Sequence, residues 1–313
     1  MQNDDLHDVV IVGGGPAGLS AAVYSGRALL STLLVEKVIP GGQLNETEFI
    51  ENFLGFEEKT LAADLMQEAR KQAERLGTKI VIDEIEKLEQ TADYYILKAG
   101  KNEYKARSVI IASGSRPREL PAEGAKRLKG KGLSYCATCD AYFFQGKDIL
   151  EVGAGDSGLT EAIFLTKFVN SVGIVVRHEE TDPSALRASP ILQKRAKENP
   201  KIHFMWNKVV EEVLGEERLA GVNLKDMSSG ETEEMKTDGL FVNIGWIPET
   251  GFLKGTLDLD ERGYLTTDDR LRTNLPGVFA AGDVRTVAAR YAQAIIAAGD
   301  GAIAAMEAEK YLS

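Results

Sequence analysis

Several residue types are scarce in this chain of 313 residues, and each shortage excludes a class of protein. Only two cysteines occur, so a secreted fold held by several disulfides is excluded. Lysine and arginine number 37 against 48 acidic residues, a net charge of −11, so no nucleic acid partner is expected. No apolar run approaches the roughly 18 residues that span a bilayer, so no membrane partner is expected either. The polar segment 1–8 lacks the features of a signal peptide, which predicts a cytoplasmic protein.

Glycine, in contrast, is abundant, with 31 residues. A chain of this length predicts two domains, and 43% hydrophobic with 27% charged residues is a globular composition. The segment from residue 8 to residue 36 reads as a strand, a glycine-rich turn, a helix and a second strand that ends in an acid. The positions of the glycines in this segment predict its chemistry.

Three glycines of this first glycine turn (residues 13–18) each have a physical task. Gly13 permits the tight turn, Gly15 lets the backbone approach a pyrophosphate, and Gly18 lets the helix pack against the strand. The helix N-terminus offers free N–H groups to the phosphates, and Glu36 can accept hydrogen bonds from ribose hydroxyls. The pattern predicts a dinucleotide site, although a turn that merely packs tightly is the alternative.

The same pattern returns in a second glycine turn (residues 153–158), between an apolar strand and a helical stretch. Both repeats end in segments that carry glycine and proline, at 113–117 and 243–248, as linkers often do. In the first repeat an amphipathic helix is predicted over residues 60–76, with Thr60 as its N-cap. The segment after 245 holds one strand and a long helix, too little for a third domain.

The economical interpretation is that this last segment returns to complete the first module. The sequence thus predicts an α/β protein with two Rossmann-like, three-layer dinucleotide-binding domains, the second inserted into the first. The first domain is expected to comprise residues 1–116 plus 246–313. The second is expected to comprise residues 117–245 and to carry the cysteine pair.

Two dinucleotide modules suggest a bound flavin that exchanges electrons with a nicotinamide. Cys136 and Cys139 have two residues between them, so they can form a disulfide that accepts electrons and passes them on by exchange. Asp140 follows directly and can donate or accept the proton of the departing thiolate. The alternatives are a zinc site, for which the three histidines lack ligand spacing, and two inert buried thiols. No metal is expected.

The sequence resembles the low-molecular-weight, bacterial or archaeal-type flavin thioredoxin reductases over essentially its whole length. The matching segments are 13–19, 41–44, 50–56, 136–140, 153–157 and 277–283. The resemblance implies a homodimer that uses NADPH and reduces thioredoxin. It implies that the first domain binds FAD, and that the second is a nicotinamide-binding-like domain that carries the redox disulfide. It assigns catalysis to Cys136, Cys139 and Asp140, with Cys136 as the more exposed sulfur and Cys139 as the one that faces the flavin. It also implies that the modules rotate about hinges near Gly114 and Gly245.

The resemblance also carries cofactor roles onto matching positions. For FAD these are Gly13, Gly15, Gly18, Glu36, Gly42, Gln43, Asn52, Asp283, Tyr291, Ala292 and Gln293. For NADPH they are Gly153, Gly155, Ser157, Arg177 and Arg187. Asp283 is expected to accept a hydrogen bond from a ribityl hydroxyl, because a bare carboxylate would repel the phosphates.

The sequence departs from the family pattern at positions that serve NADPH. Arg177 is kept in the arginine cluster, but His178 replaces its neighbour and an acidic insertion follows at 179–182. Glu151 stands in a strand where the family is usually apolar. Tyr291 either stacks on the flavin or packs at a domain or dimer contact. Reduced ferredoxin or another donor is therefore an alternative to NADPH, and a flavoprotein redox sensor is an alternative of a different class.

Overall fold

A computed structural model describes residues 6–46, 49–50 and 52–313. The chain divides into two compact units. Unit 1 comprises Met1–Arg116 and Ile247–Ser313, and unit 2 comprises Pro117–Trp246. Within the described ranges, no helix is long and apolar enough to cross a membrane.

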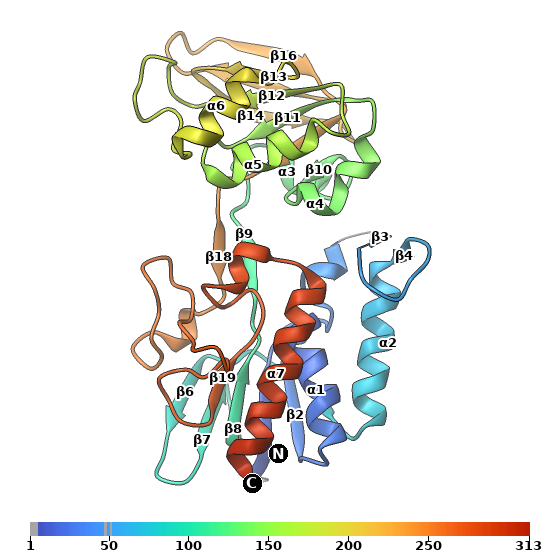
Figure 1. Ribbon diagram of the computed structural model, residues 1–313, viewed down its shortest axis with the longest axis vertical. Helices are drawn as coiled ribbons and strands as arrows, with labels where there is room; N and C mark the ends of the chain where they lie inside the picture. The colour runs from blue at the N-terminus through green and yellow to red at the C-terminus, as the bar shows by residue number, and fades with distance from the viewer. Residues whose placement is uncertain (1–5, 47–48, 51) are drawn as a thin grey trace. The chain divides into compact units, whose positions relative to one another are not determined.

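Unit 1 is built on a seven-stranded sheet in the order β5-β2-β1-β8-β7-β6, with β19 also paired to β8 (Figure 1). The central strands are parallel, and only β6 and β7 run antiparallel to their neighbours. Parallel strands are buried on both faces, which explains why the run Val9–Val12 in β1 is apolar without alternation. The strands are β1 (Leu6–Val12), β2 (Thr32–Glu36), β5 (Lys79–Ile82), β6 (Lys87–Gln90), β7 (Tyr95–Ala99), β8 (Asn102–Ile111) and β19 (Val278–Ala280).

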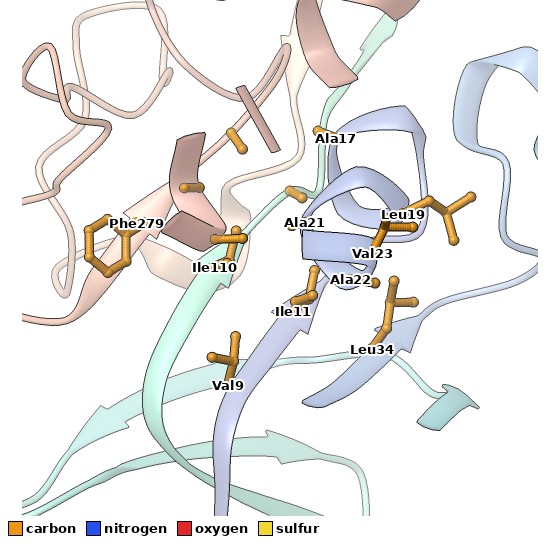
Figure 2. Close-up of a cluster of buried hydrophobic side chains, with 14 of the residues drawn as sticks. Val9, Ile11, Ala17, Leu19, Ala21, Ala22, Val23, Leu34, Ile110 and Phe279 are labelled. Carbon is orange, nitrogen blue, oxygen red and sulfur yellow. The ribbon is translucent and has the colours of Figure 1, made fainter. Parts of the chain in front are cut away.

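Three long helices belong to this unit: α1 (Pro16–Arg27), α2 (Ala62–Arg75) and α7 (Ala294–Leu312). Ile11 of β1, Ala21 of α1, Ile110 of β8 and Phe279 of β19 belong to one buried cluster (Figure 2). Gly301 of α7 lies so close to α1 that a Cβ there would run into the Ala17 carbonyl oxygen. The shorter elements are η1 (Gly42–Glu46), β3 (Phe49–Ile50), β4 (Thr60–Leu61), η3 (Gly251–Leu253) and η4 (Ala288–Tyr291).

The helix predicted over residues 60–76 starts later than expected. Its N-cap is Leu61, and Thr60 pairs with Ile50 in the small β3–β4 sheet. Because the backbone of Thr60 is paired in this sheet, the helix begins after it despite the preference of threonine for the N-cap position. The prediction of Thr60 as N-cap was wrong, whereas the helix itself is confirmed.

Unit 2 has a five-stranded, all-parallel sheet in the order β10-β17-β11-β12-β13, and a separate antiparallel sheet β14-β15-β16. Its helices are α3 (Ala125–Leu128), α4 (Ala137–Asp140), α5 (Asp156–Leu165) and α6 (Pro190–Glu198), and η2 covers Ala141–Phe144. The parallel strands are β10 (Leu133–Ser134), β11 (Asp148–Val152), β12 (Ser171–Val175), β13 (Ile202–Met205) and β17 (Gly239–Val242). The antiparallel strands are β14 (Lys208–Leu214), β15 (Gly221–Asp226) and β16 (Thr232–Lys236).

Two connecting segments, β9 (Ser115–Pro117) and β18 (Trp246–Pro248), pair with each other as a two-stranded sheet. Gly114 and Gly245, which precede these strands, have φ values of 71° and 110°, where glycine is favoured. Strand–turn–helix–strand segments with parallel strands recur in both units, as the predicted α/β class requires.

Candidate active site

The first glycine turn brings the backbone of β1, α1 and β8 into close contact. Gly13 has φ +105°, and a Cβ there would run into the carbonyl oxygen of Ala112. Gly18 approaches the Gly13 carbonyl so closely that it has no room for a Cβ either. Gly15 caps α1 without a side-chain hydrogen bond, so no side chain competes for the first N–H groups of the helix. The turn therefore has the features predicted for a pyrophosphate site, which stays a prediction.

Glu36 lies at the end of β2, beside this turn. Its Oε2 accepts a hydrogen bond from the Gly14 N–H at 2.5 Å, and its Oε1 accepts one from the Val38 N–H at 3.2 Å. The carboxylate is thereby held against the first glycine turn. The predicted hydrogen bonds to ribose hydroxyls remain a prediction.

Three other residues expected along the FAD site, Gly42, Gln43 and Asn52, make contacts within unit 1. Gly42 packs against Gly15, and the Gln43 amide donates to the Ser115 carbonyl at 2.5 Å. Asn52 Nδ2 donates to Gln293 Oε1 at 3.1 Å, although 241 residues separate them in sequence.

The residues after β19 that were expected at FAD differ in exposure and in hydrogen bonding. Gln293 Nε2 also donates to the carbonyl of Ala292 at 2.8 Å. Tyr291 is 63% exposed at the end of η4, and both sequence-based interpretations of it stay open. Asp283 accepts no hydrogen bond from the described residues, and burial with the nearby Asp300 raises its pKa to about 6. A carboxyl without a donor suits the predicted hydrogen bond from a ribityl hydroxyl.

The cysteine pair of unit 2 forms a disulfide. Cys136 and Cys139 have an S–S distance of 2.14 Å and a Cα–Cα distance of 5.3 Å. Cys136 is the N-cap of α4, and its Sγ accepts a hydrogen bond from the Cys139 N–H at 3.2 Å. The Cys136 N–H in turn donates to Ser134 Oγ at 3.1 Å. Both cysteines are half-buried, so the disulfide is neither sealed in a core nor fully exposed.

Asp140 ends α4 directly beside this disulfide. Its Oδ2 accepts a hydrogen bond from Ser134 Oγ at 2.6 Å. Burial raises the pKa of Asp140, and the Ser134 hydroxyl opposes that rise. A carboxyl with a raised pKa keeps its proton to higher pH than an exposed aspartate, so it can donate that proton to a thiolate.

The second glycine turn repeats the geometry of the first. A Cβ on Gly153 would run into the Asn243 carbonyl, and one on Gly158 into the Gly153 carbonyl. Gly155 has open space around it, and Ser157 is exposed in the first turn of α5. The turn therefore keeps the features expected for a nucleotide pyrophosphate.

The two arginines expected at NADPH are both exposed. The Arg187 N–H donates to the Ala154 carbonyl at 3.0 Å, which places its backbone beside the second turn. Arg177 follows β12 directly after Val176. In the acidic insertion, Asp182 Oδ2 pairs with His178 Nδ1 at 3.0 Å. Hydrogen bonds from Ser184 lower the pKa of Asp182, so this carboxylate stays charged.

Comparison with known proteins assigns the chain to a family. Residues 7–301 match the family described as pyridine nucleotide-disulphide oxidoreductase. Thioredoxin reductase of Bacillus subtilis is 43% identical, with 100% of this chain and 96% of the relative covered. That of Streptomyces clavuligerus is 44% identical, with 99% and 95% covered. This chain belongs to the thioredoxin reductase family.

Solved structures of that family agree. The thioredoxin reductase of Streptococcus pyogenes matches with a TM-score of 0.92 at 37% identity, covering 98% of each chain. That of Giardia duodenalis matches with a TM-score of 0.90 at 32% identity, covering 99% of each chain. The predicted family, the α/β fold with two Rossmann-like domains and the class of FAD-dependent oxidoreductase are confirmed.

Sequence reasoning missed Ser134 and Glu161, which form hydrogen bonds with the redox helix of this thioredoxin reductase family member. It also missed Asn243, which donates to Glu161. Glu161 Oε2 accepts hydrogen bonds from the Ala137 N–H at 2.9 Å and from Asn243 Nδ2 at 2.8 Å. The available signal was positional: Ser134 precedes the cysteine pair, Glu161 follows the second turn, and Asn243 opens the second linker.

Proposed function

We propose that the protein transfers electrons from NADPH through FAD and the Cys136–Cys139 disulfide to the disulfide of thioredoxin. The observation that carries the proposal is this disulfide at the start of α4, in a unit with its own nucleotide-type glycine turn. The other unit carries an independent turn of the same kind. We propose that unit 1 is the FAD-binding domain and unit 2 the nicotinamide-binding-like domain.

The described residues of unit 1 fit FAD. The first glycine turn and the N-terminus of α1 would hold the pyrophosphate, Glu36 the adenosine ribose, and Asp283 the ribityl chain. Gly42, Gln43, Asn52 and Gln293 would lie along the flavin. When bound, FAD supplies a two-electron carrier between a hydride donor and a disulfide.

The residues of unit 2 would carry out the exchange. In the dithiol state, one cysteine thiolate attacks a sulfur of the thioredoxin disulfide and forms a mixed disulfide. The second cysteine then attacks the first, which restores Cys136–Cys139 and releases thioredoxin as a dithiol. Asp140 donates the proton that the leaving thiolate needs. Two electrons and two protons leave the enzyme in each cycle. The resemblance favours Cys136 as the attacking sulfur.

NADPH is the proposed electron donor because the second glycine turn and two nearby arginines are present. Ser157 would contact the nucleotide at the start of α5. Reduced ferredoxin is the second candidate, favoured by the replacement at His178, whose imidazole is engaged with Asp182. Anaerobic addition of NADPH, NADH or reduced ferredoxin to the oxidised protein separates these donors. Rapid flavin bleaching by NADPH excludes ferredoxin as the required donor.

Two cysteine variants test the core of the proposal. Cys136→Ser and Cys139→Ser should retain FAD and lose thioredoxin reduction. Retained reduction in either variant would overturn the assignment. A redox sensor is favoured instead if the reduced wild-type protein fails to pass electrons to thioredoxin. The homodimeric state and the cytoplasmic location belong to this same proposal, and sedimentation of the holoprotein tests the former.

A further inference from the structure

Three polar side chains of unit 2 form a connected cluster: the buried Glu151 on β11, and the half-buried Glu161 on α5 and Asn243 after β17. Asn243 Nδ2 donates to Glu151 Oε1 at 2.9 Å and to Glu161 Oε2 at 2.8 Å. Glu161 Oε2 also accepts from the Ala137 N–H at 2.9 Å. Ala137 is joined by a peptide bond to Cys136, so the cluster reaches within one peptide unit of the redox disulfide.

The hydrogen-bond count distinguishes the two carboxyl groups. An amide NH₂ has two hydrogens, and Asn243 uses one for each glutamate. Glu161 receives two donors, whereas Glu151 receives one. Glu151 Oε2 has no partner, and the residue is 0% exposed. Ionising the buried Glu151, which has one donor, therefore costs more free energy than ionising the half-buried Glu161, which has two.

We propose that Glu151 is a positioning residue for the redox disulfide. As a neutral carboxylic acid it holds the Asn243 amide, and Asn243 together with the Ala137 N–H fixes Glu161 as the single negative charge of this cluster, next to Cys136. The inference rests on the proposed function only in taking this disulfide as redox-active.

The direction of the pKa of Glu151 agrees with this arrangement. Burial first, and the charge of Glu161 second, raise the pKa of Glu151 well above its ordinary value, and the Asn243 amide opposes this. Burial also raises the pKa of Glu161, opposed by Asn243 and Ala137. Because two carboxylates close to one another repel, a pair of glutamates that share one amide more readily carries one negative charge than two.

The other titratable groups on the elements packed around the cluster lie outside its hydrogen bonds. The strand neighbours of Glu151 are Ile174 on β12 and Phe241 on β17, neither of which titrates. On α4 the titratable groups are Asp140 and, in the reduced protein, the cysteines. On α5, Asp156 accepts the Ser189 N–H and Glu161 is part of the cluster.

The consequence concerns the thiols that form on reduction. A fixed negative charge near Cys136 disfavours a thiolate and so raises the thiol pKa. A second charge on Glu151 would raise it further. Because Glu151 stays neutral, the cluster places one opposing charge near the thiols instead of two, and the thiolate forms at lower pH.

Matched glutamine variants test the assignment. In the holoprotein reduced with excess dithiothreitol and then desalted, the pH dependence of alkylation by iodoacetamide gives the lower thiol pKa. Glu161→Gln should lower this pKa by roughly one unit, because it removes the charge but keeps an acceptor. Glu151→Gln should change it by less than about 0.3 units, because the acid is already neutral. Equal shifts, a larger shift in Glu151→Gln or no shift in either variant would overturn the proposal.

A second measurement covers the case in which a variant does not fold. The infrared spectrum of the wild-type holoprotein at neutral pH should contain the C=O band of a protonated, buried carboxylic acid. That band should persist in Glu161→Gln and in Asp140→Asn, and disappear in Glu151→Gln. Its absence from the wild type, or its loss in Glu161→Gln alone, would place the proton elsewhere. Neither readout uses thioredoxin, NADPH or ferredoxin, so a failure here is separate from a failure of the proposed function.

Discussion

The first glycine turn in unit 1 and the second in unit 2 share one backbone design. In both, the first glycine lies against a carbonyl of a neighbouring strand end, Ala112 in unit 1 and Asn243 in unit 2. In both, the third glycine, Gly18 or Gly158, lies against the carbonyl of the first. The main chain therefore fixes the nucleotide-type turn in the same way twice.

The side chains around the two turns differ at two matching positions. Two residues before the first glycine stands Ile11 in unit 1, but Glu151 in unit 2, and both are 0% exposed. Three residues after the third glycine stands Ala21 in the former, but Glu161 in the latter. The apolar set packs the sheet against α1, whereas the polar set connects the sheet to α4. The same turn thus accepts either packing or a hydrogen-bonded network, and the network occurs where the disulfide is attached.

The largest expected effect comes from breaking one turn at a time. Gly13→Val places a Cβ against the Ala112 carbonyl at φ +105°, where the strained backbone alone costs roughly 1–3 kcal/mol. We expect this variant to lose its flavin, measured as flavin absorbance per chain. The matched change Gly153→Val should keep the flavin and lose its reduction by NADPH. Flavin loss from both variants, or from neither, would contradict the assignment of one cofactor to each unit.

The next effect comes from exchanging the buried side chains. Ile11→Glu introduces a carboxyl where neither Asn nor Glu is available to bind it, so we expect a loss of roughly 3 kcal/mol or more in the free energy of unfolding. Glu151→Leu should cost no more than about 1 kcal/mol, because one Asn243 hydrogen bond is lost but a buried carboxyl is removed. Denaturant unfolding of the two holoproteins measures both. Similar losses would mean that the two sites do not differ in this way.

The sequence could predict the repeated turns because their signal is local. Spacing of Gly13, Gly15 and Gly18 between a strand and a helix is enough to predict the backbone path. The disulfide was predictable for the same reason, since two intervening residues limit what Cys136 and Cys139 can reach.

The polar cluster could not be predicted in this way. Glu151, Glu161 and Asn243 come from a strand, a helix and a linker, and only the folded sheet brings them together. Burial of Glu151 could be expected from its strand, but its partner could not. The prediction of Thr60 as the N-cap of α2 failed for a related reason, because the backbone of Thr60 pairs with β3 as part of β4.

A smaller effect tests the nucleotide that each unit prefers. In unit 1, Val35 of β2 pairs with Val12 of β1 and is followed by Glu36. In unit 2, Val175 of β12 pairs with Val152 of β11 and is followed by Val176 and then Arg177. An acid suits ribose hydroxyls, and an arginine suits a 2′-phosphate.

We therefore expect Arg177→Ala to raise the KM for NADPH about tenfold and to leave that for NADH unchanged. Steady-state kinetics with both donors measures this, and Arg195→Ala on α6 serves as the control arginine. An equal rise for both donors would mean that Arg177 does not contact the 2′-phosphate. Flavin reduction by neither nucleotide would instead favour the ferredoxin alternative.

The smallest expected effect concerns the acid beside the disulfide, where unit 2 again uses a hydrogen bond. The Ser134 hydroxyl donates to Asp140 at 2.6 Å and opposes the rise in its pKa. Ser134→Ala should therefore raise that pKa further, by up to about one unit. Because the protonated acid serves the leaving thiolate, the alkaline limb of the pH–rate profile should move to higher pH. Ser134→Thr keeps a hydroxyl and should leave the limb in place. A shift to lower pH in Ser134→Ala would mean that Asp140 acts in its charged form.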